Sequence, residues 1–202
     1  SELTEFLTDL RYIKEIDISI LSNFSEYLLS LYYNIKPEQA KTLIDLKNLI
    51  DKPIPRMESI VLENFGVQIK DDNIIELKLY NRWLKNLPES IGNLSSLQLL
   101  DLGMNLLSKL PETMGDLSTL EELYLDGNKL KTLPSSIGDI SSLQTLNLFG
   151  NQLSSLPESI GNLKLLKKLV LYNNNLLNLP DSIGNLESLI YLDLSSNDLL
   201  TL

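Results

Sequence analysis

Apolar and polar positions repeat every 23 residues over the last two thirds of the chain. In one unit Leu97, Leu100 and Leu102 precede Asn105, and Leu100 and Leu102 alternate as the inward residues of a short strand do. The same spacing recurs at Pro88, Pro111, Pro134, Pro157 and Pro180, at Gly92, Gly115, Gly138, Gly161 and Gly184, and at Asn105, Asn128, Asn151, Asn174 and Asn197. A unit this short cannot bury its apolar side alone, so the repeats predict stacked units that share one continuous core.

The first leucine position of each unit sets the boundaries of the repeats. There are five full units, 74–96, 97–119, 120–142, 143–165 and 166–188, and a partial sixth unit, 189–202. The asparagine comes where the chain leaves the strand, and its amide can satisfy backbone groups that a buried bend leaves unpaired. In the second unit Pro111 favours an extended Leu110, and we expect Gly115 to end a short helical turn on the convex side.

The pattern L-x-x-L-x-L-x-x-N, with the segments LPESIGNL, LPETMGDL, LPSSIGDI and LPDSIGNL, closely resembles the leucine-rich repeat family. Within it, the chain is similar to the intracellular 23-residue class found in Ras-associated scaffold proteins. The resemblance covers residues 74–202 and implies an α/β fold, a right-handed solenoid with short parallel strands on its concave face. The first unit departs from the pattern, since Arg82 stands where the asparagine belongs and Trp83 follows it. We expect Trp83 to pack under a cap.

The partial sixth unit has no convex segment and no polar cap within the sequence. Leu192, Leu194, Leu199 and Leu202 would therefore lie at an uncovered apolar end. The sequence predicts either a fragment of a longer chain or end-to-end self-association through this end.

Residues 1–73 lack the repeat and predict a helical N-terminal cap over the first unit. Apolar spacing favours helices over 21–35 and 37–50, a third over 55–64, and a less regular one near 4–12. Residues 67–70 resemble a strand that leads through a turn at 71–73 into the first repeat. Asp71, Asp72 and Asn73 could be imagined as calcium ligands, but a polar turn is favoured because no loop with ligand spacing follows.

Composition narrows the classes of function. The chain has 202 residues and a net charge of -10, and an acidic surface argues against nucleic acid and membranes as partners. It contains no Cys and no His, so it offers no thiolate nucleophile, no imidazole base and no zinc site of these ligands. We expect no catalytic residues, no cofactor and no metal. The missing Cys, an absent basic apolar leader and the lack of an 18-residue apolar run favour a cytoplasmic protein.

Parallel strands in register place equivalent repeat positions side by side, so the exposed columns of the concave face can be written from the sequence. They are Glu76, Leu99, Glu122, Thr145, Lys168 and Tyr191; Lys78, Asp101, Tyr124, Asn147, Val170 and Asp193; and Tyr80, Gly103, Asp126, Phe149, Tyr172 and Ser195. Large side chains on an uncovered sheet face are typical of a binding surface.

Tyr124, Phe149, Tyr172 and Tyr191 lie on four consecutive units, with Val170 among them. Aromatic side chains are preferred anchors of protein interfaces, although they are also common in strands without a binding role. Charged positions flank the aromatic group. The acidic ones are Glu121, Glu122 and Asp126, and the basic ones are Lys167 and Lys168. A partner would carry the complementary charges, but a solvated face explains these residues equally well.

The leading hypothesis is a non-enzymatic protein-interaction module, an intracellular scaffold or regulator that binds its partner on the concave face. The resemblance to Ras-associated scaffolds implies a small GTPase, or a signalling protein that works with one, as the partner. One alternative is that the repeats form the recognition part of a larger multidomain enzyme whose catalytic domain lies beyond residue 202. Another is a purely structural role through self-assembly.

Overall fold

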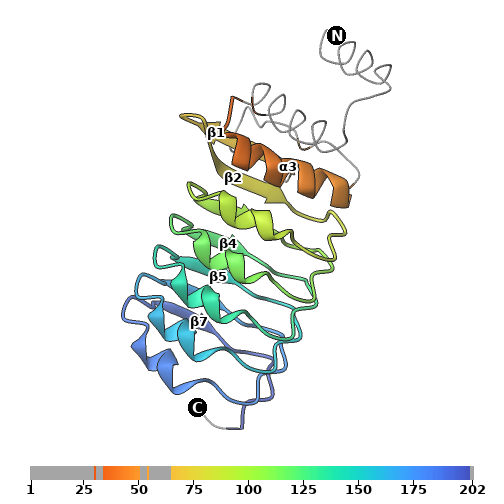
Figure 1. Cartoon of the computed structure of the whole chain (residues 1–202). Coiled ribbons are helices and arrows are strands. Elements are labelled where there is room, and N and C mark those ends of the chain that lie inside the picture. Colours follow the sequence, from red (N-terminus) through yellow and green to blue (C-terminus); the bar gives the residue numbers. More distant parts are fainter. Residues whose placement is uncertain (1–29, 31–33, 51–53, 55–64, 201–202) are drawn as a thin grey trace, which may run out of the picture.

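The computed structural model describes residue 30, residues 34–50, residue 54 and residues 65–200. Within these residues, seven strands form one sheet in sequence order, β1 to β7, and the units stack along a single axis (Figure 1). The strands are β1 (Phe65–Lys70), β2 (Asn73–Leu79), β3 (Leu99–Asp101), β4 (Glu122–Tyr124), β5 (Thr145–Asn147), β6 (Lys168–Val170) and β7 (Tyr191–Asp193). Strands β2 to β7 are parallel, which confirms the solenoid with short parallel strands on its concave face.

In the described part of the chain, five short 3₁₀ helices form the layer opposite the sheet (Figure 1). They are η1 (Glu89–Asn93), η2 (Glu112–Asp116), η3 (Ser135–Asp139), η4 (Glu158–Asn162) and η5 (Asp181–Asn185). Each begins directly after the repeated proline, whose φ near -70° suits the start of a helix. In η2, for example, the Pro111 carbonyl accepts a hydrogen bond from the Met114 N–H at 3.2 Å. The convex helical turn expected from the sequence is therefore present in every full unit.

The core lies between the sheet and the 3₁₀ layer and runs without a break through the units. Each full repeat contributes the same set of leucines and isoleucines, and in the second repeat Leu97, Leu100, Leu102 and Leu107 are fully buried. Burial falls from the fifth unit on, where Leu179 and Ile183 are half-buried, and in the sixth unit Leu194 is half-buried and Leu192 is 39% exposed. Hydrophobic burial shared between neighbours is thus what holds the units in register.

The repeated asparagines are hydrogen-bonded to the backbone, as predicted, and the first four of them are buried, whereas Asn197 is half-buried. Asn151 donates from its amide to the carbonyls of Leu125 and Leu148 at 2.9 and 3.1 Å, and it accepts from the Leu130 N–H at 3.0 Å. Each asparagine thereby ties its own bend to the bend of the preceding unit. This explains why Arg82 can replace the asparagine of the first unit. The strand before that unit is the antiparallel β1, so no preceding repeat bend needs an amide.

The repeated glycines have a different role from the predicted one. Gly115 lies inside η2 and does not end it, so the C-cap interpretation is wrong. A Cβ at Gly115 would lie 2.8 Å from the Ser136 carbonyl oxygen, and one at Gly138 would lie 2.2 Å from that of Ser159. Glycine is therefore required because successive 3₁₀ helices pack backbone against backbone.

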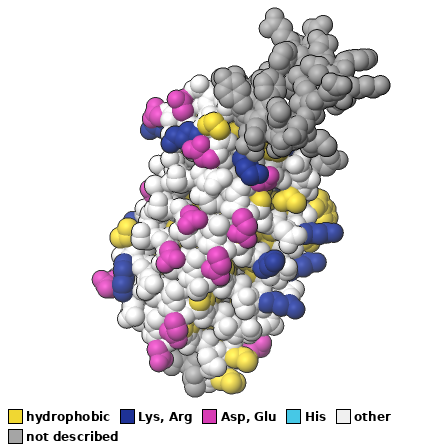
Figure 2. Space-filling model, viewed as in Figure 1, with side chains coloured by type: hydrophobic (Ala, Val, Ile, Leu, Met, Phe, Trp, Pro, Cys, Tyr) yellow, Lys and Arg dark blue, Asp and Glu magenta, His cyan; other side chains and the backbone are white. Residues whose placement is uncertain are grey.

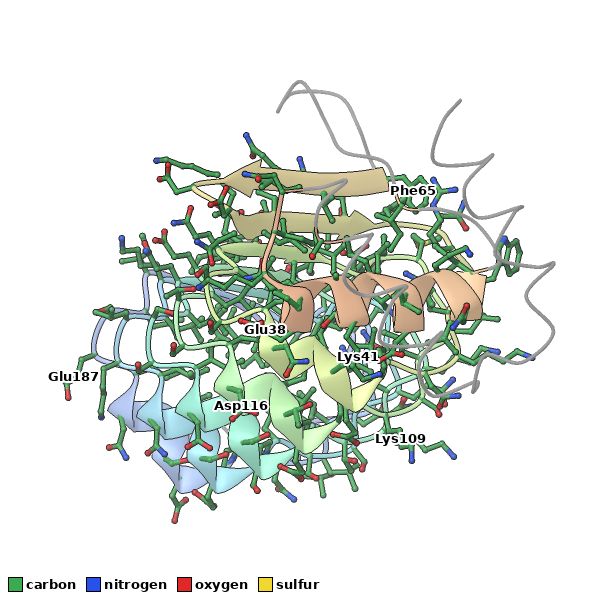
Figure 3. The ribbon with its side chains drawn as sticks, turned by 45° about the horizontal axis from the view of Figure 1, so that its top comes forward. Glu38, Lys41, Phe65, Lys109, Asp116 and Glu187 are labelled. Carbon is green, nitrogen blue, oxygen red and sulfur yellow. The ribbon has the colours of Figure 1, made fainter. Side chains whose placement is uncertain are left out.

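The first repeat is covered by the helix α3 (Pro37–Ile50) and by β1. The predicted helix over 37–50 is confirmed, and it continues the 3₁₀ layer at the N-terminal end of the stack (Figures 1 and 3). Thr42 donates to the Ser90 carbonyl at 2.6 Å, and Gln39 accepts from the Ile74 N–H at 3.0 Å. The helices predicted over 4–12, 21–35 and 55–64 fall mostly or wholly outside the described residues. The strand predicted at 67–70 is part of β1, which pairs with β2 through the polar turn at 71–72.

Left-handed backbone recurs at one position after each strand. Asn81, Met104, Gly127, Gly150, Asn173 and Ser196 all have φ between 53 and 65°. In the first unit Trp83 adopts φ 61° as well, and its side chain is 72% exposed. The prediction that Trp83 packs under the cap is therefore wrong, because the backbone turns its side chain outward and Leu84 takes the buried position.

Among the described helices, none has both the length and the apolar character needed to cross a membrane.

Candidate functional site

The concave face presents the three exposed columns in the register read from the sequence. Lys78, Asp101, Tyr124, Asn147, Val170 and Asp193 pair in order across β2 to β7, and so do Glu76, Leu99, Glu122, Thr145, Lys168 and Tyr191. The intervening leucines of β2 to β6, such as Leu123 and Leu146, are fully buried, and only the one in β7 is exposed. The third column follows the strand ends, where the Gly127 N–H donates to the Phe149 carbonyl at 2.8 Å and the Gly150 N–H donates to the Tyr172 carbonyl at 3.0 Å.

An aromatic pair occupies the middle of the face. The rings of Phe149 and Tyr172 stack with centroids 5.2 Å apart and planes 5° from parallel. The side chains are 37% and 39% exposed, so each ring has one face against its neighbour and still presents surface to solvent. Stacking across adjacent repeats fixes both rotamers before a partner arrives, which lowers the entropy lost on binding.

The two other predicted aromatics are held separately, so the four do not form one continuous ring contact among the described residues. The Lys168 ammonium lies 5.5 Å from the centroid of the Tyr191 ring, and the Tyr191 side chain is 49% exposed. Val170 is half-buried beside Lys168 on the same strand. Tyr124 is half-buried, and its hydroxyl donates a short hydrogen bond to the Glu122 carboxylate. Charged groups therefore orient both tyrosines.

Carboxylates gather around Tyr124. Burial raises the pKa of the Asp101 carboxyl, and the nearby Asp126 raises it further, against the lowering effects of the Gly103 N–H and Lys78. Burial also raises the pKa of the Asp126 carboxyl. The pKa of the Tyr124 phenol is raised well above its ordinary value by burial first and then by the Glu122 hydrogen bond and charge. This part of the face therefore carries concentrated negative charge in a partly desolvated setting.

Several polar side chains of the columns accept hydrogen bonds from backbone N–H groups. The Asp101 carboxylate accepts from the Gly103 N–H at 2.9 Å, and the Asn147 amide oxygen accepts from the Phe149 N–H at 3.2 Å. Asn147 also donates to Asp126 at 3.1 Å. The sequence did not identify Asp101 and Asn147 as site residues, although their repeat position beside Tyr124 and Val170 was visible in the period.

A polar ladder runs along the start of the strands. Lys167 donates to the Gln144 amide oxygen at 2.8 Å, and the Gln144 amide donates to Glu121 at 3.0 Å. The acidic end over β4 and the basic end over β6 are thus joined through one glutamine. Glu121, Glu122 and Asp126 lie in the repeat before that of Phe149, whereas Lys167 and Lys168 lie in the same repeat as Tyr172.

Such a surface suits recognition better than bond making. Within the described residues no group of three or more His, Cys, Asp or Glu side chains could hold a metal ion. Exposed rings on a face that carries charges of both signs can bury apolar area and select a partner by charge.

Comparisons with known proteins point to one repeat family. A family model described as "Leucine-rich repeat region" matches residues 76–151, and one described as "Leucine Rich Repeat" matches residues 142–163 and 165–186. These matches together span more than half of the chain. A comparison with curated proteins gave no match.

Solved structures with the same architecture come from bacteria and plants. A leucine-rich repeat protein of Leptospira interrogans is 40% identical over 62% of this chain and 38% of its own, with a TM-score of 0.52. The ectodomain of the plant membrane receptor kinase GASSHO1/SCHENGEN3 from Arabidopsis thaliana, in complex with CASPARIAN STRIP INTEGRITY FACTOR 2, is 30% identical over 65% of this chain and 17% of its own, with a TM-score of 0.60. The plant peptide hormone receptor RGFR1 in complex with RGF2 is 32% identical over 61% and 20%, with a TM-score of 0.52. The chain matches well under two thirds of the length of each.

Proposed function

Because the chain belongs to the leucine-rich repeat family, whose repeats generally form protein-binding modules, we propose that its concave face binds a protein partner through the Phe149–Tyr172 pair. In this proposal the chain is a non-enzymatic scaffold or regulator. Tyr191 and Val170 extend the apolar contact, and the charges on either side of it set the orientation of the partner.

The aromatic stack is the observation that carries the proposal. Two large rings lie on neighbouring repeats of a sheet face that no described helix covers, and they remain more than a third exposed. Exposure of aromatic area to water is unfavourable, and this free energy is regained when a partner buries the rings. Anchors of this kind at the centre of an interface typically cost about 2 kcal/mol or more when truncated.

For the partner we propose a small GTPase, or a signalling protein that works with one, in the cytoplasm. The support is the resemblance of the repeat segments to Ras-associated scaffolds and a composition without cysteine. The opposite charges over β4 and β6 require a partner surface with a basic and an acidic group at matching separation.

The experiment compares binding of the full chain and of a triple variant, Tyr124→Ala, Phe149→Ala and Tyr172→Ala. Purified small GTPases, each loaded with GDP or with a GTP analogue, are the probes in a calorimetric titration. The control variant removes three exposed leucines from other surfaces, Leu49→Ala, Leu165→Ala and Leu177→Ala. We expect the native chain to bind a GTPase. The aromatic variant should weaken this binding at least about tenfold, because central anchors carry most of the binding free energy, and the control variant should leave it unchanged.

Two outcomes contradict the proposal. If the leucine control weakens a bound partner and the aromatic variant does not, the partner site is not on the concave face. If no GTPase in either nucleotide state binds while another protein binds through the aromatic pair, the face is a binding surface but the GTPase assignment is wrong.

A second candidate is that the repeats form the recognition part of a larger enzyme. It is favoured by one solved neighbour, whose leucine-rich repeats are the ectodomain of a plant membrane receptor kinase. The complete open reading frame tests it directly, because a catalytic domain encoded after residue 202 would support it and an early stop codon would exclude it.

A further inference from the structure

A second surface of the molecule carries a charge opposite to that of the whole chain. The segments that follow the first three parallel strands, 82–87, 105–110 and 128–133, contain five basic residues and no acidic one, in a chain of net charge -10. Four of them are exposed lysines, Lys85, Lys109, Lys129 and Lys131. We call these four lysines, together with Trp83, the basic edge. In Figure 2 Lys and Arg side chains gather along one edge, while Asp and Glu side chains are spread over the 3₁₀ layer.

Backbone hydrogen bonds hold the basic edge in register. The Leu106 N–H donates to the Leu84 carbonyl at 2.8 Å, and the Lys129 N–H donates to the Leu107 carbonyl at 2.8 Å. The segments of the three repeats therefore lie side by side with a spacing of about 5 Å, as adjacent strands do. Lys85 and Lys131 occupy the same repeat position two units apart, so their backbones are about 10 Å apart. Figure 3 shows Lys109 at this edge and Glu187 at the opposite one.

The lysines of the basic edge have no partner of their own. Within the described part of the chain, none of the four forms an ion pair or a side-chain hydrogen bond. Glu89 and Glu112 line a surface hollow of about 330 Å³ with Lys109, but their carboxylates accept hydrogen bonds from the Thr113 hydroxyl and the Ser136 N–H of the following repeats. Among the described residues no carboxylate is therefore paired with a lysine of the basic edge, although the charged Glu89 and Glu112 lie beside Lys109.

Trp83 adds an apolar anchor at the N-terminal end of the edge. It is 72% exposed and held at φ 61°, a left-handed backbone conformation that is unfavourable for a residue with a Cβ. Trp83 occupies the same repeat position as Lys129, with the half-buried Leu106 between them. Strained backbone that presents a large ring to solvent is typical of recognition sites.

We propose that the basic edge binds an acidic protein segment, an extended run of Asp and Glu with one apolar residue that contacts Trp83. Charge complementarity with the lysines favours the Asp and Glu residues of the segment, and contact with the Trp83 ring favours its apolar residue. Because the lysines span about 10 Å and an extended chain advances about 3.3 Å per residue, about three residues of extended chain cover the edge. The carboxylates of Glu89 and Glu112 border the edge, and they would repel a wide polyanion such as duplex DNA or an anionic membrane more than a narrow peptide.

Trp83 also makes the proposal testable, because it is the only tryptophan of the chain. The probe is a short synthetic peptide with one leucine followed by a run of glutamates, capped at both ends, and a glutamine version is its control. Added to the full chain at low ionic strength, the glutamate peptide should shift the tryptophan emission to shorter wavelength with saturation, and the glutamine peptide should not. The shift should weaken as salt is raised, since the contacts are exposed charges.

Two variants with equal charge change locate the site. The triple variant Lys85→Gln, Lys109→Gln and Lys131→Gln should weaken peptide binding about tenfold, because each exposed ion pair contributes modestly and three are lost. The control variant Lys36→Gln, Lys70→Gln and Lys164→Gln removes three exposed lysines from other parts of the surface and should bind as the native chain does.

Four results would overturn the proposal. The first is an unchanged Trp83 emission at millimolar peptide, and the second is an equal peptide affinity of the two triple variants. The third is a larger emission shift with duplex DNA or phosphatidylserine vesicles than with the peptide at equal total charge. The fourth is a Trp83 emission that depends on protein concentration in the absence of peptide. The third result would assign the edge to a polyanion, and the fourth would assign it to a second copy of this chain.

Discussion

Asn151 shows how a single side chain connects two repeats. Its amide group donates to the Leu125 and Leu148 carbonyls and accepts from the Leu130 N–H, so both its donor and its acceptor ends are used inside the core. An aspartate could not donate these bonds, and a leucine could satisfy none of the three groups. The residue type is therefore fixed by the backbone around it.

Asn151→Ala should lower the free energy of unfolding by about 1–3 kcal/mol, because it leaves buried carbonyls and one N–H without partners. The matched control is Asn175→Ala, which removes an exposed asparagine of the next unit and should change stability by less than about 0.5 kcal/mol. Denaturant midpoints of the two variants measure the difference. Equal midpoints would show that the asparagine ladder does not stabilise the bends.

Asp126 tests the electrostatics of the concave face. Burial raises the pKa of its carboxyl above the ordinary value of 3.8, so the folded state binds the proton more tightly than the unfolded state. Its charged form therefore destabilises the fold at neutral pH, and this cost disappears as pH falls through the raised pKa. Asp126→Asn keeps the Oδ1 acceptor used by Asn147 and removes the charge.

Asp126→Asn should accordingly be slightly more stable than the native chain at pH 7, by less than about 1 kcal/mol because solvent screens a half-buried group. The advantage should shrink as pH is lowered toward the raised pKa. Thermal midpoints of both chains across this range are the measurement. An advantage that grows on acidification would mean that the Asp126 carboxylate is stabilised by the fold.

Residue roles differ in how far the sequence reveals them. The roles of the asparagine amide and of the strand leucines could be predicted, because each repeat places the same residue type in the same structural environment. Trp83 could not be placed, since its exposure depends on a left-handed φ that the sequence does not display at a non-glycine residue. The stacking of Phe149 on Tyr172 followed from register, but the separate partners of Tyr124 and Tyr191 depend on rotamers.

The 3₁₀ helices set the distance between repeats on the convex side. Their glycines permit backbone contact, and the closest approach is at Gly138, where a Cβ would lie 2.2 Å from the Ser159 carbonyl oxygen. At Gly184, in the last 3₁₀ helix, a Cβ would meet nothing within 4 Å. The same residue type in the same repeat position therefore has a steric requirement in one unit and none in the other.

Gly138→Ala should destabilise the chain by about 1–3 kcal/mol, because η3 and η4 must separate to admit the methyl group. Gly184→Ala should be neutral or slightly stabilising, as alanine loses less backbone entropy in a helical turn. Urea titrations of both variants, compared at equal m-value, measure the contrast. If the two substitutions cost the same, close packing of the 3₁₀ layer is not the reason for the glycines.

At the element scale the period predicted more than the composition did. Strand positions and the convex turns followed from the spacing of Leu and Pro, and α3 followed from helical spacing after Pro37. The predicted role of the repeated glycines was wrong, because a helix C-cap and a close backbone contact both require glycine and therefore look the same in the sequence. The two differ only in φ and in the neighbouring backbone, which are properties of the stacked units.

The whole molecule is a linear stack in which each unit is supported by its neighbours. Leu146, Leu169 and Leu192 occupy the same strand position in three successive repeats, and burial falls along this series. Leu146 and Leu169 are fully buried, whereas Leu192 is 39% exposed. Identical substitutions along one column therefore compare the interior of the stack with the last described repeat.

Leu146→Ala should cost about 2–5 kcal/mol, as expected for a cavity in a rigid core, and Leu192→Ala should cost much less because its site already contacts solvent. In a stack with nearest-neighbour coupling, the damage at Leu146 should spread to the units on both sides. Hydrogen exchange measures this directly, and we expect lost protection in β4 and β6 as well as in β5. Exchange that rises only in β5, or equal costs for the two variants, would show that the repeats fold as independent units and that the concave face is not held as one rigid surface.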